Sequence, residues 1–282
     1  MGKVLLIAAA LLLLLLVICA IADTNRFVTV TYRLSAGLGK RPFRCVFLSD
    51  IHEKVYGRNN DRLFSAIDAC EPECILIGGD MMKAVPGVDV QWTLDFVKRL
   101  REKYPVYYAY GNHEHRLFLY PERYGDAGQR LQQGLDELGV VSLVNESVYL
   151  EEQGISLSGL KIHKRFYRRG RLQHLEPEQM QKWLKPVRQP GFKILLAHNP
   201  DYFSTYQKWG ADLVLSGHVH GGIVRLPVLG GVVSPRIALF PKYDGGRFDE
   251  SGKTMIVSRG LGVHTLPVRL FNPGELVNLI IE

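Results

Sequence analysis

Short apolar runs alternate with helix-like segments along most of this chain. Apolar side chains at helical spacing follow the first two runs, from about Asn60 and over about 89–103. Strands that alternate with helices in this way are typical of βαβ units and of a largely parallel sheet. The runs that predict buried strands are 45–48, 74–77, 106–110, 193–196 and 212–215.

A different pattern fills the middle of the chain. Leu131, Leu135 and Leu138 lie at helical spacing and predict a helix that leads into short strands joined by short turns. We expect these short strands to be antiparallel, because a short turn joins antiparallel neighbours. Asn199 and Pro200 suit the N-cap and first turn of another helix. The other predicted strands are 27–32, 140–144, 147–150, 155–160, 254–257 and 276–281, and a further helix passes through Met180, Trp183 and Leu184.

The N-terminal segment is long and uncharged. No charged side chain occurs between Val4 and Ala22, and a helix of this length nearly spans a bilayer core. The residues Ala20-Ile21-Ala22 also match the cleavage site of a signal peptide. We favour a retained anchor, since the run is long for a signal peptide, and a cleaved signal remains the alternative. We therefore divide the chain into an N-terminal membrane anchor, 1–23, and one folded domain, 24–282.

The predicted domain lies against the membrane. Its first strand begins only a few residues after the anchor, so no flexible stalk separates the two. Basic residues after the anchor outnumber Lys3, which taken alone favours a cytoplasmic C-terminal side. Large domains are translocated despite such charges, and we expect a single-pass protein of the cell membrane with an extracytoplasmic catalytic domain.

Composition narrows the function only a little. The chain has 282 residues and a formal net charge of +7, which suits phosphorylated ligands, anionic lipid or nucleic acid without selecting one. Its four cysteines form no CxxC pair, and we interpret them as buried thiols.

Each predicted buried strand ends in side chains that can bind a metal ion. In α/β sheets, sites form outside the carboxyl ends of the strands, so these side chains can meet in one crevice. Each motif alone has an ordinary explanation as a turn, a helix cap or a buried histidine. Together they offer imidazole, carboxylate and amide ligands without a thiolate, which suits manganese, iron or zinc and is enough for two ions. The candidates are Asp50, His52, Asp80, Asn112, His113, His198, His218 and His220.

These motifs as a set resemble the signature of calcineurin-like metallophosphoesterases, over roughly residues 44–282. The resemblance implies an α/β fold of two packed mixed β-sheets flanked by helices, an αββα sandwich. It also implies roles for the ligands and for His113, which resembles the family's histidine that contacts the phosphate and can protonate the leaving oxygen. By this resemblance Asp50, His52 and His220 bind one divalent ion, Asn112, His198 and His218 bind a second, and Asp80 bridges them.

A narrower resemblance concerns a bacterial membrane-associated branch. The N-terminal segment, the motif 217–222 and the late segment 257–262 are similar to that branch, which includes phosphodiesterases and an enzyme that hydrolyses UDP-2,3-diacylglucosamine. Ile223 stands where the branch usually has glutamine, which leaves the metals in place and the substrate open.

A basic stretch at 161–171 is either a solvated hairpin or a binding edge. We expect Lys164, Arg165, Arg168 and Arg169 to contact substrate or anionic lipid headgroups. Phe166 and Tyr167 between them make contact with nucleic acid a weaker alternative.

The predicted function is that of a monomeric, membrane-tethered phosphoesterase with two divalent metal ions. Its expected substrate is a phosphodiester or pyrophosphate that is lipid-linked or close to the membrane. A nuclease or general phosphodiesterase is the alternative enzyme. A metal-binding membrane scaffold is the alternative without catalysis, and His113 argues against it because a scaffold needs no proton donor.

Overall fold

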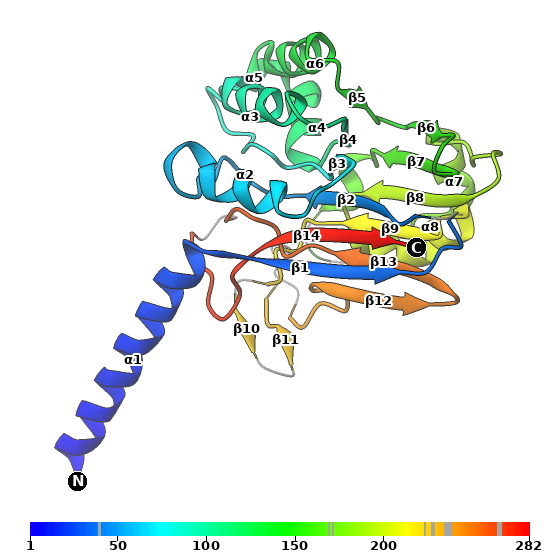
Figure 1. Ribbon diagram of the computed structural model, residues 1–282. Coiled ribbons are helices and arrows are strands. Elements are labelled where there is room, and N and C mark those ends of the chain that lie inside the picture. Colours follow the sequence, from blue (N-terminus) through cyan, green and yellow to red (C-terminus); the bar gives the residue numbers. More distant parts are fainter. Residues whose placement is uncertain are drawn as a thin grey trace.

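Two six-stranded sheets pack against each other, helices cover both outer faces, and helix α1 (Gly2–Thr24) projects away from the domain (Figure 1). This arrangement is seen in a computed structural model that describes residues 1–38, 41–168, 170, 172–222, 224–226, 229–233, 239–263 and 267–282. The other helices are α2 (Asp61–Asp68), α3 (Gln91–Arg101), α4 (Asn112–Leu119), α5 (Pro121–Tyr124), α6 (Ala127–Glu137), α7 (Pro177–Trp183) and α8 (Phe203–Trp209), with 3-10 turns η1 (Arg58–Asn60), η2 (Lys164–Tyr167) and η3 (Pro200–Tyr202).

Both sheets are mixed. The first has the order β1-β14-β2-β3-β4-β5, in which only the β14–β2 pair is antiparallel, and the second has the order β12-β13-β9-β8-β7-β6, with antiparallel pairs at both edges. A short hairpin, β10–β11, stands apart from the sheets near α1 (Figure 1). The strands are β1 (Phe27–Leu34), β2 (Phe43–Leu48), β3 (Cys74–Ile77), β4 (Val106–Tyr108), β5 (Val141–Ser142), β6 (Glu146–Leu150), β7 (Ile155–Leu160), β8 (Phe192–Ala197), β9 (Leu213–Ser216), β10 (Arg225–Leu226), β11 (Gly230–Gly231), β12 (Gly246–Glu250), β13 (Lys253–Val257) and β14 (Gly274–Ile281).

Alternation along the strands builds three apolar layers. In β2, Phe47 points into the core between the sheets, while its neighbours Val46 and Leu48 pack under the helices of the first sheet. In β9, Leu215 faces the core between the sheets, and Val214 packs toward α8 on the outer face of the second. Buried central strands therefore read as continuous apolar runs, because both of their faces are covered.

The predicted αββα sandwich is confirmed, with one error in the middle of the chain. The short strands β6 and β7 are antiparallel as predicted, but β5 pairs in parallel with β4. The reason is α6, which lies between β4 and β5 and provides the crossover that a parallel pair needs. The stretch 161–171 is not a hairpin where it is described, because Lys164–Tyr167 forms the 3-10 turn η2.

Helix α1 is long and apolar enough to cross a membrane, a property that a signal sequence near the N-terminus shares. Its last turn is attached to the domain. The buried carboxylate of Asp23 accepts a hydrogen bond from the backbone N–H of Asn272 (3.0 Å) and pairs with Arg26 (2.7 Å). The hydroxyl of Thr24 accepts one from the backbone N–H of Arg269 (3.0 Å). The end of the helix is thereby held by the segment that precedes β14.

Candidate metal centre

The loops after β2, β3, β8 and β9 and the start of α4 meet in one place. They bring together the side chains of six of the seven predicted metal ligands. The seventh, Asn112, begins α4, and all seven are buried. Three overlapping groups of side chains have ligand atoms that lie within 4.8 Å of one another. These groups are Asp50–His52–His220, His52–Asp80–His113 and Asp80–His198–His218.

Two of these groups are centred on different carboxylates. In the first, His220 Nε2 lies 3.3 Å from Asp50 Oδ1 and 3.2 Å from His52 Nε2. In the other, His198 Nε2 lies 3.1 Å from Asp80 Oδ2 and 3.8 Å from Asp50 Oδ1. The centre therefore has two adjoining positions for a cation, and Asp80 shares a group with side chains on both sides.

Backbone hydrogen bonds orient two of the imidazoles. His198 Nδ1 lies 2.8 Å from the carbonyl oxygen of Gly78, and His52 Nδ1 lies 3.3 Å from that of Met82. In each ring the proton is therefore on Nδ1. The other nitrogen, Nε2, faces the carboxylates and is the ligand atom. Metal-binding histidines are usually held by such a bond on the second nitrogen.

The ligand loops have a strained backbone. Asp50, His52, Asp80, His218 and His220 all have positive φ angles, between 46° and 70°. Residues other than glycine are uncommon at positive φ. Residues held there cluster at functional sites, where the surrounding structure maintains the conformation.

Close packing explains two glycines of the motifs. A Cβ atom at Gly217 would clash with the Asp50 carboxylate and the Ser49 hydroxyl, and one at Gly111 would clash with the Asp80 carboxylate. Because glycine has no Cβ atom, neighbouring backbone N–H groups can approach these carboxylates closely. Those of His218 and His113 donate hydrogen bonds to Asp50 Oδ2 (3.0 Å) and Asp80 Oδ1 (2.7 Å).

The carboxylates and imidazoles shift one another's ionisation. Burial raises the pKa of Asp50 and Asp80, but the neighbouring imidazoles outweigh it and hold both carboxyl pKa values well below their usual range. Burial lowers the pKa of His198, but the two carboxylates outweigh it and raise that pKa to about 10. Burial lowers the pKa of His218 to about 3. The centre thus holds two carboxylates that strongly attract positive charge.

His113 stands beside this group in a defined tautomer. Its Nδ1 accepts a hydrogen bond from the backbone N–H of Ala84 (2.8 Å), so the proton of the neutral ring is on Nε2. Nε2 lies 3.9 Å from Asp80 Oδ2. Burial lowers the pKa of His113, which favours the neutral ring.

Glu114 also supports the metal centre, although the sequence motifs predict no role for it. Its buried carboxylate accepts hydrogen bonds from the backbone N–H groups of Asp80 (2.8 Å) and Gly111 (3.0 Å) and from the hydroxyl of Tyr108 (2.8 Å). It thereby joins the loop after β3 to the start of α4. Its position directly after the Gly-Asn-His motif was the available signal.

Asn272 and Arg269 support the centre from the C-terminal segment. The Asn272 amide donates to the carbonyl oxygens of His220 (2.7 Å) and Gly222 (2.6 Å). The buried Arg269 guanidinium donates to backbone carbonyls that include those of Arg259 (2.8 Å) and Gly260 (3.1 Å). No local sequence pattern identifies either residue, because their partners lie far away or in irregular loops.

The basic stretch reaches the centre through one aromatic ring. The ring of Tyr167 lies edge-on to that of His218, with the centroids 5.1 Å apart. Lys164 donates to the Tyr120 hydroxyl (3.0 Å), Arg165 lies over the ring of Phe166, and Arg168 is exposed. The predicted roles of these cations in binding remain predictions, and Arg169 and Ile223 lie outside the described residues.

The residues fit a pair of divalent ions. Asn112 Oδ1 and His218 Nε2 are buried without a hydrogen-bond partner among the described residues, and both belong to the predicted ligand set. A bound cation would satisfy both atoms, which are otherwise costly to bury. Oxygen and imidazole donors without a thiolate suit a hard or borderline divalent metal.

Comparison with known proteins agrees with this chemistry. The family model for calcineurin-like phosphoesterases matches residues 43–222, which include every predicted ligand. The uncharacterized protein YpbG of Bacillus subtilis is 26% identical over 89% of this chain and 85% of its own length. An uncharacterized metallophosphoesterase of Helicobacter pylori is 28% identical over 85% of this chain and 60% of its own length. The phosphodiesterase YaeI of Escherichia coli is 25% identical over 69% of this chain and 66% of its own length. This chain therefore spans less than two thirds of the length of the Helicobacter pylori protein and of YaeI.

Proposed function

Because this chain belongs to the calcineurin-like phosphoesterase family, and is thus a metal-dependent phosphoester hydrolase that binds two divalent ions, we propose that it hydrolyses a phosphodiester or pyrophosphate at the membrane surface. In this proposal α1 remains as the anchor, and the substrate is a lipid-linked or membrane-proximal phosphoester. The observation that carries the proposal is the overlap of the ligand groups, in which Asp80 belongs both to the group with His52 and to the group with His198 and His218.

We assign the ligands as the sequence predicts. Asp50, His52 and His220 hold one ion, Asn112, His198 and His218 hold the other, and Asp80 lies between them. When bound, a pair of divalent ions neutralises the phosphoryl oxygens and lowers the pKa of a coordinated water so that it can attack phosphorus. The low pKa values of Asp50 and Asp80 keep both carboxylates charged in the range where the enzyme would work.

His113 completes the assignment as the hydrogen-bond donor to the leaving oxygen. The Ala84 N–H fixes the proton on Nε2, which is the nitrogen on the side of Asp80. An N–H held there can donate a hydrogen bond to the oxygen of the departing alcohol or phosphate and so stabilise the negative charge that develops on a poor leaving group.

The membrane part of the proposal is supported by the end of α1. The hydrogen bonds of Asp23 and Thr24 to the segment 269–272 hold the helix directly against the domain. A domain held this way can move little away from the bilayer, so a substrate anchored in the same membrane meets it at high local concentration.

The test is metal-dependent hydrolysis by the full chain in detergent micelles. With added Mn²⁺ we expect cleavage of bis-p-nitrophenyl phosphate, about two metal ions per chain by elemental analysis, and loss of activity with EDTA. Asp80→Asn should lose metal and activity together, because it removes a charge shared by both positions. A protein that binds two ions and cleaves no phosphoester with Mn²⁺, Fe²⁺ or Zn²⁺ would instead support the scaffold alternative.

A further inference from the structure

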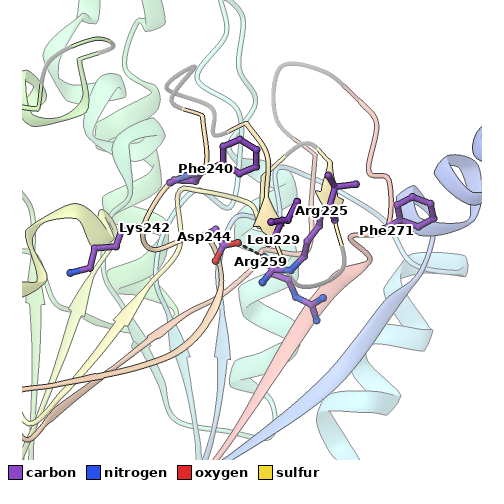
Figure 2. A pocket seen from close by; sticks show the side chains of 10 residues that line it. Arg225, Leu229, Phe240, Lys242, Asp244, Arg259 and Phe271 are labelled. Atoms are coloured by element: carbon purple, nitrogen blue, oxygen red, sulfur yellow. Dashed lines mark hydrogen bonds and ion pairs between the residues drawn. The ribbon is translucent and has the colours of Figure 1, made fainter.

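A pocket of about 600 Å³ lies beside the metal centre and has no role in the assignments above. It is formed by the β10–β11 hairpin, the loop before β12 and the segment that follows β13, as Figure 2 shows. All of its described lining residues lie beyond residue 222, where the family match ends. Its described lining residues are Arg225, Leu226, Leu229, Gly230, Phe240, Pro241, Lys242, Asp244, Arg259 and Phe271.

The floor of the pocket is cationic. Arg225 and Arg259 lie next to each other, since a Cβ atom placed on Gly245 would come within 3.4 Å of both side chains. One Nη of Arg225 pairs with Asp244 (3.0 Å), and Nε of Arg259 pairs with the buried Glu275 (3.0 Å). Lys242, the third cation of the described lining, pairs with Glu250 (3.0 Å) outside it, so Asp244 is the carboxylate that faces the pocket. Planar guanidinium groups in this setting suit an anionic phosphate.

The rim of the pocket is apolar and exposed. Leu229, Phe240 and Phe271 line the pocket and are 63%, 55% and 43% exposed. In Figure 2, Phe240 and Phe271 stand on two sides of the arginine pair. Leu239 and Val268, their near neighbours in sequence, are also exposed. Large exposed apolar groups gathered around a polar cavity mark a surface that is covered by another apolar molecule.

The rim lies at the membrane end of the molecule. Phe271 directly precedes Asn272, whose N–H binds Asp23 at the end of α1. A backbone bridge between Val224 and Leu270 joins this segment to the start of the hairpin. When α1 spans a bilayer, its last turn is at the interface, and the rim is therefore at the same level. Aromatic and aliphatic side chains at that level can enter the acyl region.

The same pocket adjoins the metal centre. Its Arg259 precedes Gly260, and a Cβ atom on Gly260 would lie 2.7 Å from Asp50 Cβ. On the other side, His220 and Arg225 are separated by only four residues, and Arg225 donates weakly to the carbonyl of Gly221 (3.5 Å). One molecule can therefore reach from the metal centre into the pocket and on to the membrane.

We propose that this pocket is the subsite for the non-reacting part of an amphiphilic substrate. An apolar chain lies along Leu229, Phe240 and Phe271, and a second anionic group, beyond the phosphate that is cleaved, binds Arg225 and Arg259. The inference rests on the proposed function. It adds the substrate class, a lipid with an anionic group next to the scissile phosphate, and the residues that select it.

The chain subsite is tested with two substrates that have the same scissile bond, methyl p-nitrophenyl phosphate and dodecyl p-nitrophenyl phosphate. For the full chain in micelles, kcat/KM should favour the dodecyl ester. Phe240→Ser with Phe271→Ser should lower that preference about tenfold, because the chain loses apolar contacts worth roughly fourfold per buried methylene. Val141→Ser, which removes another exposed apolar side chain (41% exposed) from β5, should keep the wild-type preference.

The anion subsite is tested with didodecyl diphosphate and didodecyl phosphate, whose cleavage is followed by ³¹P NMR. Arg225→Gln should lower kcat/KM about tenfold more for the diphosphate than for the monophosphate diester. Arg259 is not changed, because its loss would leave Glu275 buried without that partner. Arg247→Gln is the matched control, since Arg247 forms a similar pair with Asp249 (2.8 Å) on β12.

The outcomes separate the two proposals. Wild-type enzyme that cleaves the methyl ester but shows no preference for the dodecyl ester, or variants that keep the wild-type ratios, would overturn the subsite and leave the proposed function intact. Wild-type enzyme with bound metal that cleaves none of the four esters would overturn the proposed function, and the subsite with it.

Discussion

At the residue scale, one hydrogen bond decides which ring nitrogen of His113 carries the hydrogen. Because the Ala84 N–H occupies Nδ1, the ring can only offer a proton from Nε2. His113→Asn should therefore lower kcat by about two orders of magnitude for a diester with an alkoxide leaving group, because the developing charge on that oxygen loses its hydrogen-bond donor. The loss should be much smaller for bis-p-nitrophenyl phosphate, because p-nitrophenolate leaves without a proton. Steady-state kinetics on the two esters measure the difference.

Metal analysis of the same variant separates this role from a structural one. Two ions should remain, since His113 is outside the assigned ligands, although its ring shares a group with His52 and Asp80. An equal loss on both esters, or a missing ion, would make His113 a ligand or a support and not a hydrogen-bond donor to the leaving oxygen.

At this scale the sequence predicts residue types better than their conformations. The metal ligands could be proposed because each follows an apolar run. The positive φ angles of Asp50, His218 and three other ligand residues could not, because tertiary contacts impose them against local preference. The same holds for Glu114, whose partners come from two separate loops.

At the scale of elements, prediction depends on whether a segment is covered on both faces. β2, β3, β8 and β9 are buried between layers, so their apolar runs locate them within about two residues. β5 has two residues and little burial. The available signal for its parallel partner was the predicted helix through Leu131 and Leu138, which provides the crossover from β4. The hairpin β10–β11 was missed because two-residue strands have no detectable alternation.

The turn after β9 depends on Asn272, a residue from a distant element. Asn272→Ala removes two hydrogen bonds to the carbonyls of His220 and Gly222, which would cost roughly 2–3 kcal/mol of stability for two buried acceptors. Metal affinity should also fall by about tenfold, because His220 is no longer held in place. Thermal unfolding and metal titration measure the two effects.

Asn278→Ala is the control for this prediction. Asn278 donates an exposed hydrogen bond to Thr31 (3.1 Å) on the neighbouring strand and does not contact the metal ligands. It should change stability by less than about 1 kcal/mol and leave metal affinity at the wild-type value. Equal effects of both variants on metal binding would contradict a specific role for Asn272.

At the scale of the whole molecule, the end of the N-terminal helix α1 and the segment before the C-terminal strand β14 meet beside the metal centre. β1 and β14 are parallel neighbours (Figure 1), so the segment before β14 meets the end of α1. The sequence predicts a long apolar N-terminal helix and a domain close to it. It does not predict the contact between Asp23 and Asn272, because 249 positions separate them. Through Asn272 the helix end is one residue away from the backbone of His220.

Asp23→Ala tests whether this contact holds the helix to the domain. The variant leaves the Asn272 N–H without its charged acceptor, and a hydrogen bond to a charged group contributes about 1.5–3 kcal/mol. We therefore expect the amides around Asn272 to exchange with deuterium at least about tenfold faster in the full chain, as measured by mass spectrometry of the peptide that contains 267–273. Asp126→Ala, which breaks the exposed Asp126–Arg130 pair (3.0 Å), should leave that peptide unchanged. Unaltered exchange in Asp23→Ala would mean that the segment is held by its other contacts, such as those of the Arg269 guanidinium, and that α1 is free to tilt relative to the pocket.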